Sequence, residues 1–188
     1  MYYYQSFTWV ESYVSYLQSV AAANVVINSI DLQAGCGVIG ASWVTTATGG
    51  GFDYRLEAVP PAQVQATVAA DGAEGRIVTA TTFDDAAGNI VLISYGWQGD
   101  TTTSYEAKTL IAMPTDVQNQ AITLAGEGYF ISAFGGNNTD GYVLIGMRVQ
   151  GDSLPRPITN GSTPKDSAYG TVVAWLSGVY GAPTIYEQ

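Results

Sequence analysis

Three glycines recur at a fixed interval along the chain, and this interval constrains the fold more than any other feature. Gly75, Gly128 and Gly181 are each 53 residues apart, and a stretch of helical periodicity precedes each one. Asn24 lies 51 residues before Gly75. Gly and Asn are the residues that most readily take the left-handed conformation that ends a helix. The interval therefore predicts a chain built from stacked copies of one small unit.

A second set of glycines keeps nearly the same interval. Gly37, Gly88 and Gly141 are 51 and 53 residues apart, and each lies between a turn-rich stretch and a strand-like stretch. In the best-defined copy, a strand over 104–113 precedes Pro114, which suits the start of a helix. Two strands around a polar hairpin turn follow this helix. The predicted unit is therefore βαββ.

The predicted fold class is α+β, a single domain of about four tandem βαββ repeats of roughly 52 residues. We expect the helices to cover one face of a mainly antiparallel sheet, because a lone unit would bury too little apolar surface to fold by itself. A closed ring of such units would resemble the pentein propellers, but their unit number and catalytic residues are not shared, so the resemblance implies no activity. The expected units span residues 1–48, 52–99, 104–151 and a truncated 154–188.

The two ends of the chain carry separate predictions. The first unit is expected to hold a helix over 8–24, and the last a helix over 166–180 followed by one strand at 183–188. The Tyr-rich segment 2–7 is either the first strand of the first unit or the partner of that orphan last strand. We favour the second role, which could close the array, because a free edge strand exposes unpaired backbone groups.

The composition excludes several functions. The chain has no histidine, which removes Ser-His-Asp and Cys-His catalysis and the commonest zinc ligand. Cys36 is the single cysteine, so no internal disulfide forms, and its place between glycines suits a small turn residue. We therefore expect no metal and no cofactor, and a non-catalytic protein is favoured over an enzyme.

Charge and hydropathy restrict the partners. The chain holds 6 Lys and Arg against 16 Asp and Glu, a net charge of −10, which leaves no basic face for nucleic acid or anionic lipid. No apolar run approaches the roughly 18 residues of a membrane-spanning helix. The first residues lack the basic start and cleavage site of a signal peptide. Few lysines and many Thr, Tyr, Gly and Asn are typical of exported or surface proteins, but the compartment stays open.

Two polar loops in equivalent places are the candidate site. QGDT at 98–101 and QGDS at 150–153 are 52 residues apart, and each follows the last strand of a unit. The pattern favours tight turns in which the Asp side chain accepts local N–H groups. The functional alternative is a shared binding surface made by Asp100 and Asp152, with Trp43 and Trp97 beside it at the ends of strands.

Other charged residues have mainly structural interpretations. Arg148 breaks the symmetry between units, and we expect it to pair with Asp152 more readily than to hold a carboxylate ligand. Asp84 and Asp85 lie in a predicted hairpin turn, where Asp is a common residue. Charges that alternate with apolar residues predict half-exposed strands with cross-strand ion pairs, and they lie at Glu57, Glu106 and Lys108.

The sequence favours a binding module for a glycan or a protein, with Trp43, Trp97, Asp100, Arg148 and Asp152 as candidate ligand-binding residues. Aromatic rings beside carboxylates and amides suit sugar recognition. One alternative is a hydrolase in which the repeat brings Asp100 and Asp152 together as a carboxylate pair. Another is a structural protein that assembles through the Tyr-rich first strand.

Overall fold

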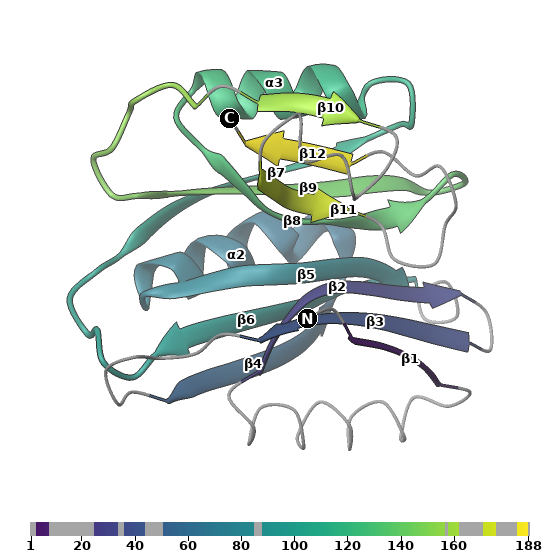
Figure 1. Ribbon diagram of the computed structural model, residues 1–188, viewed down its shortest axis with the longest axis horizontal. Coiled ribbons are helices and arrows are strands. Elements are labelled where there is room, and N and C mark those ends of the chain that lie inside the picture. The colour runs from purple at the N-terminus through teal and green to yellow at the C-terminus, as the bar shows by residue number, and fades with distance from the viewer. Residues whose placement is uncertain are drawn as a thin grey trace.

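Figure 1 shows the computed structural model, in which sheets of mainly antiparallel strands combine with helices in an α+β fold. The residues described are 3–7, 25–33, 36–43, 51–84, 88–156, 158–161, 171–175 and 184–187, with side chains in 26–30, 51–84 and 88–156. The helices are α2 (Val64–Ala73) and α3 (Val117–Gly126), with a 3-10 turn η1 (Pro61–Gln63) before α2. The strands are β1 (Tyr3–Phe7), β2 (Val25–Gln33), β3 (Cys36–Trp43), β4 (Phe52–Val59), β5 (Arg76–Asp84), β6 (Asn89–Trp97), β7 (Tyr105–Ala112), β8 (Phe130–Asn137), β9 (Gly141–Val149), β10 (Ile158–Gly161), β11 (Thr171–Trp175) and β12 (Thr184–Glu187).

The described strands form four sheets of three strands, and each sheet has the same order. The orders are β1-β3-β2, β4-β6-β5, β7-β9-β8 and β10-β12-β11, which we name the first to fourth sheets. Neighbouring strands are antiparallel throughout, and the strand that comes last in the chain lies in the middle. In the second and third sheets a helix joins the first edge strand to the second, which gives the element order βαββ.

The periodic glycines adopt the backbone conformations that their pattern predicts. Gly75 and Gly128 follow α2 and α3 with φ of 77° and 90°, and each begins the turn into the next strand. Gly88 and Gly141 have φ of 68° and 96° at the ends of the two hairpin turns. Side chains with a Cβ rarely adopt such angles, so glycine is required at these helix ends and turns. Asn24 and Gly181 lie outside the described residues.

Both faces of the second sheet are buried. In β6, Ile90 and Leu92 pack against α2 and the third sheet, whereas Val91 and Ile93 pack against β2 on the opposite face. Successive side chains of a strand point to opposite faces, so a strand covered on both faces is apolar at every position. The third sheet is covered in the same way, with α3 on its other face.

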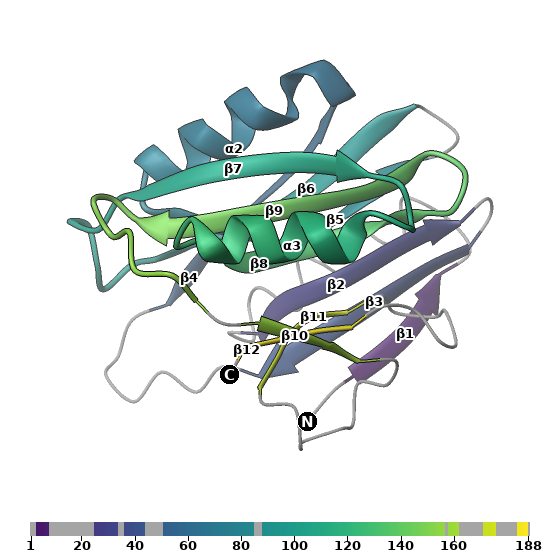
Figure 2. The ribbon, with the colours of Figure 1, turned by 90° about the horizontal axis from the view of Figure 1, so that it is seen from above.

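The second strands of the four sheets contact one another in turn. β2 contacts β5, β5 contacts β8, β8 contacts β11, and β11 contacts β2. Figure 2 shows β2 beside β8 as well. β5 and β8 approach each other closely, and a Cβ added to Gly135 would overlap the carbonyl oxygen of Thr81. Glycine at this position therefore allows two backbones to meet without side chains between them.

A β-bulge interrupts the same place in the second strand of every sheet. The register shifts after Ile27 in β2 and after Val78 in β5, and also after Ile131 and Val172 in the other two sheets. A bulge removes one residue from the ladder of backbone hydrogen bonds. The N–H of Ile27 donates to the Tyr95 hydroxyl at 3.1 Å.

The next sheet repeats this arrangement with a different acceptor. The N–H of Val78 in β5 donates to Sδ of Met147 at 3.3 Å. Met147 in β9 corresponds to Tyr95 in β6. Met147 pairs with Phe130 and Tyr95 pairs with Ile77, and these two partners lie equally far after the glycines that end α3 and α2. A backbone group next to each of these bulges is thus satisfied by a side chain of the following sheet.

Helix α2 docks on the edge of the third sheet, along β7 (Figures 1 and 2). The Gln65 amide donates to the Ala107 carbonyl at 3.0 Å, and its oxygen accepts the N–H of Thr109 at 2.7 Å. A Cβ on Gly72 would lie 2.6 Å from the Tyr105 carbonyl oxygen, so the helix and the strand are close here as well. The Gln65 side chain binds edge groups of β7 as a neighbouring strand would.

The fourth sheet corrects two predictions. The segment predicted as a helix over 166–180 contains β11, and β10 begins only at Ile158. The fourth sheet holds three strands, so it has as many strands as the other sheets and is not truncated. The sequence TVVAW in β11 is rich in β-branched and aromatic residues, and pairing with β12 favours the strand over the weak helical periodicity.

The preferred role of the first segment is also wrong. β1 pairs with β3, as the first strand of its own sheet, and β12 lies in the middle of the fourth sheet between β10 and β11. A strand paired on both sides has no edge left for β1. The helix predicted over 8–24 lies outside the described residues. None of the helices in the described residues is long and apolar enough to cross a membrane.

Candidate functional site

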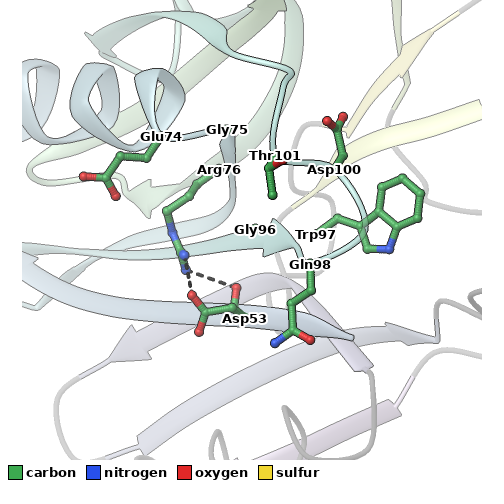
Figure 3. A pocket seen from close by; sticks show the side chains of 9 residues that line it. All are labelled: Asp53, Glu74, Gly75, Arg76, Gly96, Trp97, Gln98, Asp100 and Thr101. Atoms are coloured by element: carbon green, nitrogen blue, oxygen red, sulfur yellow. Dashed lines mark hydrogen bonds and ion pairs between the residues drawn. The ribbon is translucent and has the colours of Figure 1, made fainter. Parts of the chain in front are cut away.

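An open pocket of about 260 Å³ lies at one end of the second sheet. Figure 3 shows it where β4 and β5 begin and where β6 leads into the QGDT loop. Residues from three strands and two turns therefore meet at one place. They are Asp53, Glu74, Gly75, Arg76, Gly96, Trp97, Gln98, Asp100 and Thr101.

Arg76 forms the floor of this pocket. It is the first residue of β5, directly after the helix-ending Gly75, and it pairs with Gly96 on β6. A Cβ on Gly96 would lie 3.4 Å from Nη1 of Arg76, so the glycine leaves room for the guanidinium to lie across the strand. The side chain of Arg76 is only 6% exposed.

The buried guanidinium of Arg76 is well supplied with acceptors. Nη1 donates to the Asp53 carboxylate at 2.7 Å, and Nη2 donates to the backbone carbonyls of Asp53 and Ser94 at 3.1 and 3.2 Å. Nε donates to the Ser94 hydroxyl at 3.2 Å. Because these bonds occupy every nitrogen of the group, the buried charge is stable at this position.

A second guanidinium and a buried carboxylate lie behind Arg76. Asp71 on α2 is 1% exposed, and its Oδ1 accepts a bond from Arg55 at 2.6 Å. The same oxygen lies 3.8 Å from Nε of Arg76. Arg55 also pairs with Glu74 at 2.7 Å, and this hydrogen bond raises the pKa of Arg55. Oδ2 of Asp71 has no hydrogen-bond partner among the described residues.

Asp100 is held by its own loop. Its Oδ1 accepts the N–H groups of Thr102 and Thr103 at 2.9 and 3.1 Å, and its Oδ2 accepts the Thr103 hydroxyl. The hydroxyl bond and then the backbone bonds hold the pKa of Asp100 well below its usual range. The predicted turn with an Asp that accepts local N–H groups is therefore present at 98–101.

Trp97 lies at the rim of the pocket. It is the last residue of β6, it is 40% exposed, and a Cβ on Gly99 would lie 2.8 Å from its ring. Figure 3 shows the indole turned away from Arg76, on the side of Asp100. The ring therefore packs on the turn and leaves part of its surface to solvent.

The third sheet carries a related but different charge cluster. Arg148 pairs with Glu106 at 2.5 Å, donates to the Glu127 carbonyl at 2.7 Å and lies 4.5 Å over the ring of Tyr129. The expected cross-strand ion pair of Glu106 is thus present, because Glu106 and Arg148 are partners in the ladder. The bond to Arg148 lowers the pKa of Glu106.

The predicted pairing of Arg148 with Asp152 is wrong. Asp152 pairs with Arg156 at 2.8 Å and accepts the N–H of Leu154 at 3.0 Å, and the latter bond is the main cause of its lowered pKa. Lys108 likewise pairs with Glu127 in the turn after α3, at 2.6 Å, and not with a strand neighbour. Groups in the turns after the helices can also bind basic side chains on the strands. The alternation of residues along a strand does not reveal these contacts.

The candidate residues are only partly brought together. Trp97 and Asp100 line the pocket, whereas Arg148 and Asp152 belong to the third sheet and its following loop and do not line it. Trp43 ends β3 and pairs with Val25. Val25 lies as far before the bulge of β2 as Arg76 lies before the bulge of β5. Trp43 therefore corresponds to Gly96, the partner of Arg76, and not to Trp97. The Trp43 side chain lies outside the described residues.

Sequence reasoning missed Arg76, Asp53 and Glu74. The available signal was the position of Arg76 directly after the periodic Gly75, because the residue directly after Gly128 is Tyr129. The pocket presents carboxylate and amide oxygens and an aromatic edge. In the part of the chain that the structure describes, no group of three His, Cys, Asp or Glu side chains could hold a metal ion.

Comparisons with protein-family models, with curated proteins and with solved structures find no match for this chain.

Proposed function

We propose that the protein is a non-catalytic binding module that holds a glycan or a protein ligand at the pocket of the second sheet. The exposed ring of Trp97 at the rim of an open, polar pocket carries this proposal. An aromatic surface beside hydrogen-bonding groups suits sugar rings and the side chains of a protein partner. Asp53 and Gln98 supply the polar contacts.

The acidity of the loop carboxylates favours binding over hydrolysis. A glycoside hydrolase needs one carboxylic acid whose pKa is raised so that it can protonate the leaving group. The pKa of Asp100 is lowered first by the Thr103 hydroxyl and then by backbone N–H bonds, and that of Asp152 is lowered mainly by the N–H of Leu154, so both are ionised near neutral pH. They also follow different sheets, and Asp100 alone of the two lines the pocket.

A glycan array followed by titration calorimetry tests the proposal. Trp97→Ala should weaken binding at least about fivefold, because a stacked aromatic contact contributes on the order of 1 kcal/mol. Val149→Ala is the matched control, since Val149 ends β9 as Trp97 ends β6 and is 44% exposed. No ligand on the array or in pull-downs, or equal loss in both variants, would contradict the proposal.

We also propose that the four sheets belong to tandem βαββ repeats that close into a ring. The shared strand order, the bulge in each second strand and the contact of β11 with β2 support this arrangement. Removal of residues 154–188 should then speed amide exchange in β2, which precedes that segment by more than a hundred residues. In an open array the exchange of β2 would be unchanged.

A further inference from the structure

We propose that this pocket selects a cationic hydrogen-bond donor, and that its ligand is an amino sugar with a free, protonated amine. The inference rests on the proposed function, since it names the ligand class of the same site. It excludes neutral and acidic sugars as the preferred ligands.

The basic groups around the pocket are already occupied. Arg76 donates to Asp53 and Ser94 through all three nitrogens, and Arg55 donates to Asp71 and Glu74 through both terminal nitrogens. A carboxylate or sulfate on a ligand would have to displace these protein acceptors. Buried guanidinium groups lose strong charge-assisted bonds in such an exchange. The pocket is therefore poorly suited to an anionic ligand.

The groups that remain open to a ligand are acceptors. The side chain of Asp53 is 64% exposed and that of Glu74 is 56% exposed, although each gives one oxygen to an arginine. The second oxygen of Asp71 lies buried behind the pocket, so it adds negative charge but is not open to a ligand. Carboxylate oxygens accept and never donate when ionised, so the complementary ligand group is a donor.

The net charge around the pocket also favours a cationic ligand. Four carboxylates stand in or behind the pocket against two guanidiniums, an excess of two negative charges. The chain as a whole has a net charge of −10, which adds to the attraction for a cation. The partly exposed indole of Trp97 adds an aromatic group at the rim, and aromatic rings attract alkylammonium groups. A protonated amine satisfies both features.

Size restricts the ligand to about one sugar ring. The pocket volume of about 260 Å³ lies below the usual range for drug-sized ligands, and the pocket is open to solvent. A terminal or internal amino-sugar residue of a chain fits this description.

Calorimetry with short glucosamine oligomers, their N-acetylated counterparts of equal length and uronic-acid oligomers tests the inference. Below the pKa of the amine, the glucosamine oligomers should bind at least about fivefold more tightly than the acetylated ones, and the uronic acids least. Asp53→Asn and Glu74→Gln should each reduce that preference roughly two- to fivefold, as expected for exposed charge pairs. Glu127→Gln is the control, since it removes the same charge from the turn after α3.

Each outcome separates the inference from the proposed function. Equal binding of glucosamine and acetylated oligomers, with Trp97→Ala weakening both, would overturn the choice of an amine and leave the binding module intact. Tetramethylammonium serves as a cation without a sugar. If it binds in an Asp53-dependent way while no sugar does, the charge selection holds and the glycan ligand is wrong. If neither the cation nor any oligomer binds, both are wrong.

Discussion

In the second sheet the guanidinium beside the first strand comes from Arg76 at the start of β5, whereas in the third sheet it comes from Arg148 near the end of β9. The two residues occupy partner positions of corresponding strand pairs. Arg76 lies opposite Gly96 in the second sheet, and in the third sheet Tyr129 takes the place of Arg76 and Arg148 that of Gly96. In both sheets the partner is a carboxylate on the first strand, Asp53 or Glu106. The fold thus fixes where a charge pair forms and leaves open which strand supplies the cation.

The interior behind these pairs differs more. Asp71 on α2 is a buried carboxylate, and Leu124 holds its place on α3 as a fully buried apolar side chain. Ser94, which binds Arg76, corresponds to Gly146, where a Cβ would lie 2.9 Å from Tyr129. The same backbone therefore accepts either a hydrogen-bonded charge network or an apolar cluster. The charged version borders the pocket described above.

The largest expected effect lies where β5 meets β8. Gly135→Ala should lower the free energy of unfolding by about 3 kcal/mol or more, because the new Cβ overlaps a backbone oxygen that cannot move alone. Thr82 holds the corresponding place in the second sheet, and Thr82→Ala should cost only about 1 kcal/mol. Urea unfolding of both variants measures the difference. Similar costs would show that β5 and β8 are not in close contact.

The next largest effect on stability concerns the buried charge network of the second sheet, which the third sheet replaces with an apolar cluster. Asp71→Leu should cost about 2–3 kcal/mol, because buried Arg76 loses a nearby negative charge and Arg55 loses a partner. Adding Arg76→Tyr and Ser94→Gly copies the third sheet and should restore stability to within about 1 kcal/mol of the wild type, since apolar groups can replace a buried ion pair. Chemical denaturation gives both values. A triple variant no more stable than the single one would show that the two interiors are not interchangeable.

The pH dependence of stability distinguishes the two bulge acceptors, because the Tyr95 hydroxyl can ionise and the Met147 thioether cannot. Burial raises the pKa of Tyr95 to about 12 in the folded protein, against about 10 in the unfolded chain. The folded state therefore favours the neutral phenol, and stability is retained below pH 10 and lost as the pH rises toward about 12. The loss specific to Tyr95 should reach about 2–3 kcal/mol.

The control for this prediction is Tyr95→Met, which places the acceptor of the third sheet in the second. Its stability should fall less steeply over the same pH window, measured by denaturation at a series of pH values. A parallel decline in both proteins would mean that other tyrosines cause the loss. Tyr95→Phe should also lower stability at neutral pH by about 1–2 kcal/mol, because the N–H of Ile27 loses its acceptor.

The smallest effect concerns the docking of the helices. Gln65→Ala should cost about 1 kcal/mol, because water replaces the bonds to the exposed edge of β7, and the amide of Thr109 should exchange faster. Gln118 holds the same position on α3, which contacts β10. We expect a similar cost for Gln118→Ala. No cost there would show that α3 docks without this side chain.

Local signals explain what the sequence could predict. Gly75, Gly128, Gly88 and Gly141 were placed correctly, because a left-handed turn depends on one residue and leaves a direct mark. The strand in 171–175 was mistaken for a helix, since its short apolar run has no decisive period and pairing with β12 decides its structure. The Tyr-rich segment was assigned the wrong partner for the same reason.

The pocket was harder to predict. The bonds that build it join residues 16 to 23 positions apart in the chain, such as Arg55 with Asp71 and Arg76 with Asp53. No short motif marks such a set. Trp97 and Asp100 were found because their loop recurs, and the recurrence also suggested Asp152, which serves its own turn. Repetition therefore located the loops but did not indicate which of them borders a pocket.

The bulges have a consequence for how the chain matures on the ribosome. The acceptor for Ile27 lies 68 residues further along, and that for Val78 lies 69 residues further along. At typical rates of synthesis, each bulged strand waits about 3 to 14 s after it is made until its acceptor is made. During that interval water must solvate the open amide. Each newly made sheet therefore completes the one before it, and maturation of the nascent protein proceeds from its N-terminal side.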